Sequence, residues 1–223
     1  MAKSSRAANR QALLKARVRV IYQRLDKAYP EAKLDLNFSS PLELLIALIL
    51  AAQARDELVN EVTAELFKKY RTAADYANAP TAELEQAVRR SNFYRNKTRL
   101  IQKCCRAIVE RFGGRVPDNL EDLLTLPGVG RKTANILLGN AFGKPAIGVD
   151  THVMRLSQRL GFTRQSNPDK IEADLLPLVP EKQRTRFCHL LQYHGRRVCL
   201  AAKPRCPVCT IRPYCPYPAK TQA

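Results

Sequence analysis

The sequence predicts an all-α protein, and three observations support that fold class. Apolar residues make up 45% of the 223 residues, which is enough to fill the core of one large domain or two small ones. They recur with helical spacing along most of the chain, and no stretch alternates convincingly with the period of two that a half-buried strand requires. Helix-capping residues also stand where several of the apolar stretches begin.

The first marked helical stretch begins with a capping pattern. Ser40 is the expected N-cap, Pro41 takes the first helical position and Glu43 the third, which predicts a capping box. The dense apolar run that follows predicts a helix buried on most sides. Thr81 is the expected N-cap of a later helix, and Glu83 would stabilise its start through the helix dipole.

The rest of the chain continues as helices. An amphipathic helix is expected within residues 95–114, with Ile101, Cys105 and Ile108 on its apolar side and Gly113 at its end. Further helices are expected within residues 118–126, 131–143, 149–161, 168–179 and 182–199.

The net charge indicates a polyanionic partner. The formal net charge is +18, and residues 1–30 together with residues 181–223 supply +15 of it. Such asymmetry favours nucleic acid as the partner, although a merely solubilising surface stays an alternative. Arg95 and Lys97 lie in a further basic segment and are expected to contact phosphates.

The chain carries no pattern of export or membrane insertion. Its N-terminus lacks the apolar segment of a signal peptide, and the longest apolar run, Leu44–Ala52, is too short to span a bilayer. We therefore expect a cytoplasmic protein without membrane contact, associated with the nucleoid if the partner is DNA. An odd number of cysteines, seven, argues against a disulfide framework.

The stretch LPGVGRKTA, residues 126–134, predicts a tight turn between two helices. Glycine can adopt positive φ, and the exposed N–H groups of such a turn, at a helix N-terminus, suit a phosphate oxygen. The alternative is a plain corner between helices that needs glycine for steric reasons. With the basic charge, phosphate contact is favoured, and the residues expected to bind DNA here are Leu126, Gly128, Val129, Gly130 and Arg131.

Lys132 follows this turn and has two possible roles. As a phosphate contact it needs only its charge, whereas as a nucleophile it must lose a proton, against an ordinary pKa of about 10.4. The first turn of a helix, partial burial and the neighbouring Arg131 would all lower that pKa. A neutral amine could attack an electrophilic sugar carbon and form a Schiff base. Asp150 is expected at a helix N-cap, and the residues alone give it no other role.

Four cysteines near the C-terminus are spaced for a metal centre. The pattern C-x6-C-x2-C-x5-C comprises Cys199, Cys206, Cys209 and Cys215. A zinc site usually has two close pairs, so a single close pair with two outlying cysteines fits a 4Fe–4S cluster somewhat better. The cysteines within helical segments are expected in the core: Cys104, Cys105 and Cys188.

Three motifs in this order resemble one family. The hairpin LPGVGRKTA, the segment VDTHV at residues 149–153 and the cysteine pattern are together similar to the endonuclease III family. Its members are bifunctional DNA glycosylases and abasic-site lyases of the helix-hairpin-helix superfamily. The resemblance covers residues 36–215 and implies two helical domains: a six-helix barrel with the hairpin at residues 34–144, and an iron–sulfur domain formed by residues 1–33 and 145–223.

The resemblance also implies roles for individual residues. Lys132 would be the nucleophile, Asp150 the catalytic carboxylate, and the four cysteines the ligands of one 4Fe–4S cluster. Gln53 would fill the space left by a flipped nucleotide, and Phe93 would be the apolar wedge beside it. The implied activity is removal of oxidised pyrimidines from double-stranded DNA, with β-elimination at abasic sites through a lysine Schiff base. A monomer is expected.

The sequence differs from the family pattern at two positions near the expected site, and three alternative functions stay open. Arg55 stands where many relatives have a hydroxyl residue near Gln53, and Asn92 stands where a glycine is expected, which affects the expected lesion range. Adenine glycosylases of the same superfamily lack the lysine at position 132. A pyrimidine-dimer glycosylase could share every motif, and a non-catalytic iron–sulfur DNA-binding protein would bind duplex without nicking it.

Overall fold

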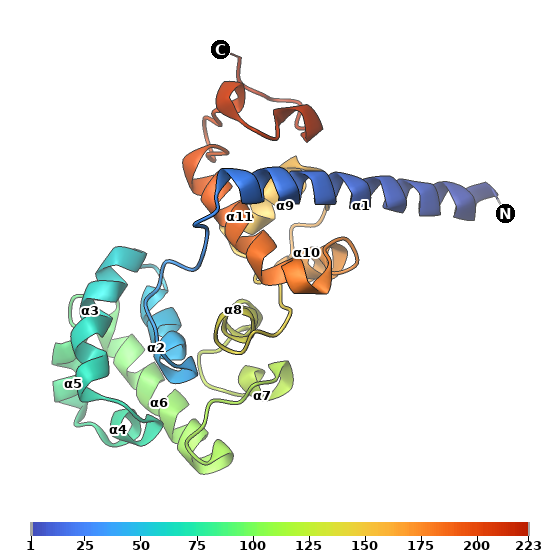
Figure 1. Cartoon of the computed structure of the whole chain (residues 1–223). Helices are drawn as coiled ribbons and strands as arrows, with labels where there is room; N and C mark the ends of the chain where they lie inside the picture. The colour runs from blue at the N-terminus through green and yellow to red at the C-terminus, as the bar shows by residue number, and fades with distance from the viewer. Residues whose placement is uncertain (1, 223) are drawn as a thin grey trace. The chain divides into compact units, whose positions relative to one another are not determined.

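The computed structural model describes residues 2–222 and divides into two compact units. One unit comprises residues 34–144, and the other comprises residues 1–33 together with residues 145–223. Every regular element within residues 2–222 is a helix, which confirms the predicted fold class (Figure 1). The assignment of the units to a six-helix barrel domain and an iron–sulfur domain stays a prediction.

The unit at residues 34–144 is built around one apolar helix. Its helices are α2 (Pro41–Ala51), α3 (Asp56–Lys69), α4 (Ala73–Asn78), α5 (Thr81–Ala87), α6 (Tyr94–Phe112), α7 (Leu120–Leu124) and α8 (Arg131–Ala141). Helix α2 packs against α3, α6 and α8, and Leu44, Leu45 and Leu50 are fully buried. A helix that is apolar on most sides is stable only when neighbours cover those sides, as they do here.

The helix starts agree only in part with the sequence expectations. Ser40 is the N-cap of α2, and its hydroxyl accepts from the backbone N–H of Glu43 at 3.2 Å. The Glu43 carboxylate accepts from the backbone N–H of Ser39, so the expected capping box is not completed at Ser40. The expectation that Thr81 caps α5 is wrong, because Pro80 is the N-cap. The Thr81 hydroxyl instead donates to the Gln102 side-chain carbonyl at 3.2 Å, which stabilises the contact between α5 and α6.

The other unit forms its core from both ends of the chain. Its helices are α1 (Ala2–Ala28), α9 (Thr151–Arg159), α10 (Pro168–Leu175) and α11 (Arg184–Arg197), with short 3-10 helices at Glu181–Gln183, Cys206–Val208 and Arg212–Tyr214. Helix α11 packs against α1 and α9 through fully buried residues such as Phe187 and Leu190. No helix within residues 2–222 has the length and apolar character needed to cross a membrane.

Part of the basic C-terminal region has a structural role. Arg186 donates to the Asp26 carboxylate at 2.8 Å and to carbonyls that follow α1, including that of Tyr29 at 2.9 Å. Arg197 pairs with Glu31 at 2.6 Å. These two arginines hold the end of α1 against α11, so they contribute to folding as well as to the positive charge of this region.

Candidate functional site

The hairpin between α7 and α8 depends on one glycine. Gly128 has φ +83°, and a Cβ at this position would lie 2.5 Å from a methyl group of Leu100. Both the backbone conformation and the close approach therefore require glycine. Gly130 has φ −85°, so of the two glycines in this turn Gly128 is the one that uses the positive φ that glycine allows. The Val129 N–H donates to the Leu126 carbonyl at 3.1 Å, which closes the turn.

Lys132 lies in the first turn of α8 and is exposed. The first hydrogen bond closing α8 joins the Ala134 N–H to the Gly130 carbonyl at 3.0 Å. The N–H groups before Ala134 therefore belong to the first turn, where a helix offers donors and positive potential to an anion. The expectation that Lys132 is partly buried is wrong. Its exposure leaves the amine within reach of a macromolecular substrate.

Two loops of the unit at residues 34–144 meet at exposed, strained residues. We call residues 52–55 and 88–93 the paired loops. Gln53 (φ 56°) and Phe93 (φ 59°) are the two non-glycine residues with positive φ within residues 2–222. Both side chains are exposed, and Phe93 is 62% exposed. The Asn92 amide donates to the Gln53 carbonyl at 2.9 Å, so the structure brings these two predicted DNA-contact residues onto neighbouring loops.

Lys97 does not have the role expected from the sequence. It is only 5% exposed, and its ammonium donates to the Leu50 carbonyl at 2.7 Å and to the Ser91 hydroxyl at 2.8 Å. Burial lowers the pKa of Lys97. The expectation that it contacts phosphates is therefore wrong, because its donors face the interior of the unit. Arg95, two residues earlier, is exposed.

Asp150 is the N-cap of α9, as expected. Its Oδ1 accepts from the Val153 N–H at 2.7 Å. It belongs to the unit that contains α9, whereas Lys132 belongs to the unit at residues 34–144. The cap fixes the position of the carboxylate at the first turn of α9.

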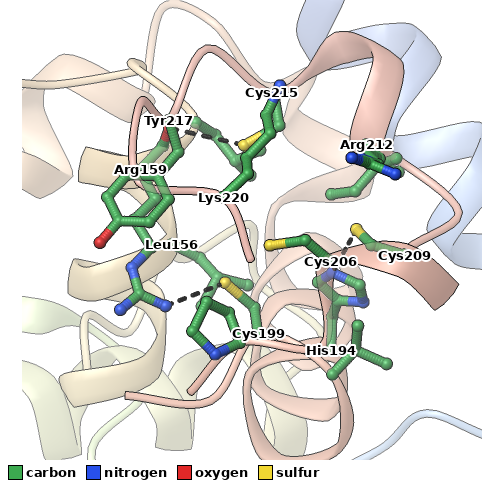
Figure 2. A pocket seen from close by; sticks show the side chains of 14 residues that line it. Leu156, Arg159, His194, Cys199, Cys206, Cys209, Arg212, Cys215, Tyr217 and Lys220 are labelled. Atoms are coloured by element: carbon green, nitrogen blue, oxygen red, sulfur yellow. Dashed lines mark hydrogen bonds between the residues drawn. The ribbon is translucent and has the colours of Figure 1, made fainter. Parts of the chain in front are cut away.

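The four cysteines of the predicted metal centre line one pocket (Figure 2). Apolar side chains such as Leu156 and Ile211 form part of the wall of this pocket. Cys199, Cys206, Cys209 and Cys215 are all half-buried, whereas the three cysteines expected in the core are buried. The structure thus brings together sulfur atoms from across 17 residues of sequence.

The donor set of four thiols around one pocket is of a kind that suits a 4Fe–4S cluster. Within the described part of the chain, no three Cys, His, Asp or Glu side chains are placed to hold a single ion. Zinc would require each sulfur to lie about 2.3 Å from one point. In a 4Fe–4S cluster each sulfur binds a different iron, which suits donors spread around a pocket. Burial raises the pKa of Cys209 to about 11, so a metal bound here would have to supply the free energy that ionises this thiol.

Basic and aromatic residues surround these sulfurs. Arg159 donates to the Cys199 sulfur at 3.3 Å, and His194 Nε2 lies 3.4 Å from the Cys209 sulfur (Figure 2). The Tyr29 hydroxyl lies 2.9 Å from His194 Nδ1. Burial lowers the pKa of His194 to about 4, which keeps its ring neutral at neutral pH. Sequence reasoning missed His194 and Arg159, because the cysteine spacing gives no signal of residues that contact the sulfurs.

Helix α9 also holds the segment that carries the first cysteine. Arg155 donates to the carbonyls of Gly195 and Cys199 at 3.0 and 3.1 Å, and Arg159 donates to the Leu200 carbonyl at 2.7 Å. The helix that Asp150 caps at its start is therefore bonded to the first cysteine's segment through two arginines in its second half.

Comparisons with known proteins show which family the chain is similar to. A model of the HhH-GPD superfamily of base excision DNA repair proteins matches residues 46–181. The chain is 49% identical to endonuclease III of Synechocystis sp., over 86% of this chain and 88% of that one, and 44% identical to endonuclease III of Bacillus subtilis, over 84% and 86%. A solved structure of a trapped covalent intermediate of endonuclease III with DNA matches with a TM-score of 0.86 and 44% identity, covering 91% of this chain and 96% of that one.

Proposed function

Because the chain belongs to the endonuclease III group of the HhH-GPD base excision repair superfamily, it is a DNA glycosylase with abasic-site lyase activity, and we propose that Lys132 is its nucleophile. The observation that carries this proposal is an exposed lysine in the first turn of α8, directly after the hairpin. Hairpin N–H groups and the start of α8 would hold a phosphate and so place the sugar beside Nζ.

The proposed chemistry has two stages. With the damaged nucleotide flipped out of the stack, the neutral amine attacks C1′, a C–N bond forms, and the bond to the base breaks as the base takes up a proton. Ring opening then gives an imine between Nζ and C1′. Loss of a proton from C2′ then forms a C2′=C3′ double bond and breaks the C3′–O3′ bond, so the 3′ phosphate leaves and the strand is nicked.

Asp150 would assist both stages as a carboxylate. Its Oδ1 is engaged by the α9 cap, which orients the group and leaves the second oxygen for proton transfer. A negative charge at this position would also stabilise the positive charge that develops on the sugar. Gln53 and Phe93, on the paired loops, would enter the space that the flipped nucleotide leaves.

We propose that the protein removes oxidised pyrimidines. We also propose that it acts as a monomer on double-stranded DNA. The name shared by the relatives supports this class, and Arg55 beside Gln53 makes the range of accepted bases a matter for experiment. The test is incubation with duplexes that each hold one defined lesion: thymine glycol, dihydrouracil, an abasic site or a pyrimidine dimer. Release of thymine glycol and dihydrouracil supports the proposal. Activity confined to the dimer and the abasic site would contradict it.

We further propose that the cysteine pocket holds one 4Fe–4S cluster. Cys199, Cys206, Cys209 and Cys215 would be the ligands, and positively charged side chains at the pocket, Arg159, Arg212 and Lys220, suit the negative charge of a thiolate-bound cluster. A bound cluster supplies a cross-link around which the C-terminal segment is ordered, together with a redox-active centre. No step of the proposed reaction passes through it.

Protein purified without oxygen should therefore be brown. We expect iron and acid-labile sulfide at about four atoms each per chain, the content of one cluster. Replacing Cys209 by Ser should lower the iron and the sulfide content, because a hydroxyl is a poor iron ligand. Replacing the buried Cys104 by Ser, as a control, should leave the iron content unchanged. Stoichiometric zinc without sulfide would contradict the proposal.

Duplex binding should depend steeply on salt. The logarithm of the binding constant should fall linearly with the logarithm of salt concentration, because each neutralised phosphate releases counterions. Arg95→Gln should reduce that slope by about one and leave lesion preference unchanged, since a phosphate contact carries no base information. Binding isotherms at several salt concentrations measure this, and a flat dependence would contradict it.

A further inference from the structure

The paired loops hold a backbone conformation that their side chains disfavour. Gln53 and Phe93 both have positive φ without being glycine, a conformation that persists only where surrounding contacts impose it. The Asn92 bond to the Gln53 carbonyl joins the loops, but it comes from an exposed side chain. A buried contact is needed to fix where each loop begins.

Lys97 on α6 supplies such a contact for both loops. Its ammonium donates to the carbonyl of Leu50, three residues before Gln53, and to the hydroxyl of Ser91, two residues before Phe93. The Leu50 carbonyl belongs to the last turn of α2, where the helix dipole favours a cation. The Ser91 side chain is itself buried, which shields the contact from water. One side chain thus ties α2, α6 and the loop between α5 and α6.

Packing alone does not account for a lysine at this position. Its burial lowers its pKa, and the two acceptors of its hydrogen bonds, the Leu50 carbonyl and the Ser91 hydroxyl, are both neutral groups. An apolar side chain of similar length would fill the same space without that cost. What the apolar side chain lacks is the ability to donate to Leu50 and Ser91.

We propose that Lys97 is a positioning residue for lesion recognition, whose ammonium fixes the end of α2 against Ser91 so that Gln53 and Phe93 enter the duplex as a preformed wedge. This inference rests on the proposed function, in which those two residues open the base stack. A recognition group displaced by about 1 Å can cost about a hundredfold in rate, so the tie affects turnover without touching DNA.

Lys97→Met tests the proposal on two abasic substrates. One is a fully paired duplex, and the other is a duplex whose abasic site lies in a preopened bubble that needs no wedge. We expect the rate of borohydride trapping to fall about tenfold to a hundredfold on the paired duplex and to stay within about twofold of wild type on the bubble. Lys103→Met is the matched control, because it removes an exposed lysine from the same helix, and both of its rates should stay near wild type.

Ser91→Ala keeps the lysine and removes one acceptor, so it provides the test if Lys97→Met does not fold. It should lower trapping on the paired duplex by about threefold to tenfold and spare the bubble. An equal loss on both substrates, or an unchanged rate on the paired duplex, would overturn the role of Lys97. If the wild-type protein forms no adduct on either substrate, the proposed function fails instead.

Discussion

Lys132→Gln should abolish the covalent adduct and lower strand cleavage by about three orders of magnitude or more. Removing a covalent nucleophile removes the step itself, and only an imine is reduced by borohydride to a stable link. The protein should fold normally, since the side chain is exposed. It should still bind damaged duplex, because the hairpin and the basic surface remain. Trapping gels and binding isotherms on an abasic duplex measure both effects.

The control for this substitution is Lys103→Gln, which removes the same charge from an exposed position on α6. It should leave both trapping and cleavage near the wild-type level. Undiminished trapping by Lys132→Gln would move the nucleophile to another amine, with the chain's α-amino group as the next candidate. Lys132 would then be one more surface charge beside a phosphate-binding turn.

Asp150→Asn should slow turnover by about a hundredfold to a thousandfold without removing the adduct. An asparagine still caps α9, so thermal stability should stay close to that of wild type. Asp150→Ala should lose the same activity and, in addition, about 1 kcal/mol of folding stability through the lost cap. Single-turnover kinetics and thermal unfolding of the two variants separate the chemical role from the structural one. Normal turnover by Asp150→Asn would reduce the residue to a cap.

The parts of the fold that sequence predicts well are those set by local contacts. Ser40 and Asp150 cap their helices because a side chain bonds to a backbone N–H three residues later. The end of α6 at Gly113 (φ 58°) follows from the same kind of local rule. Thr81 does not cap α5, because Pro80, one residue earlier, takes the non-helical N-cap position.

The features that the sequence does not predict depend on contacts between residues that are separated in the chain. The turn at Gln53 interrupts an alanine-rich stretch without glycine or proline, and its carbonyl accepts a hydrogen bond from Asn92, 39 residues later in the chain. Lys97 is buried and donates to Leu50 and Ser91, which are respectively 47 and six residues away in the chain. A basic segment read along the sequence gives each lysine the same chance of facing solvent.

Some residues of the candidate site can be predicted from local motifs, and others cannot. The hairpin and the cysteine spacing are local motifs, so Lys132 and the four cysteines can be found from the sequence. The sulfur contacts of Arg159 and His194 come from α9 and α11, and only packing of these helices brings them to the pocket. Such residues follow no spacing rule, although they determine the surroundings of the four sulfur atoms.

The nucleophile is identified most directly by mapping the trapped adduct. Wild-type protein is reduced with borohydride on an abasic duplex, the nucleic acid is digested, and the modified peptide is sequenced by mass spectrometry. We expect the sugar remnant on Nζ of Lys132 and on no other amine of the chain. A remnant on the α-amino group or on another lysine, with Lys132 unmodified, would contradict the proposed mechanism.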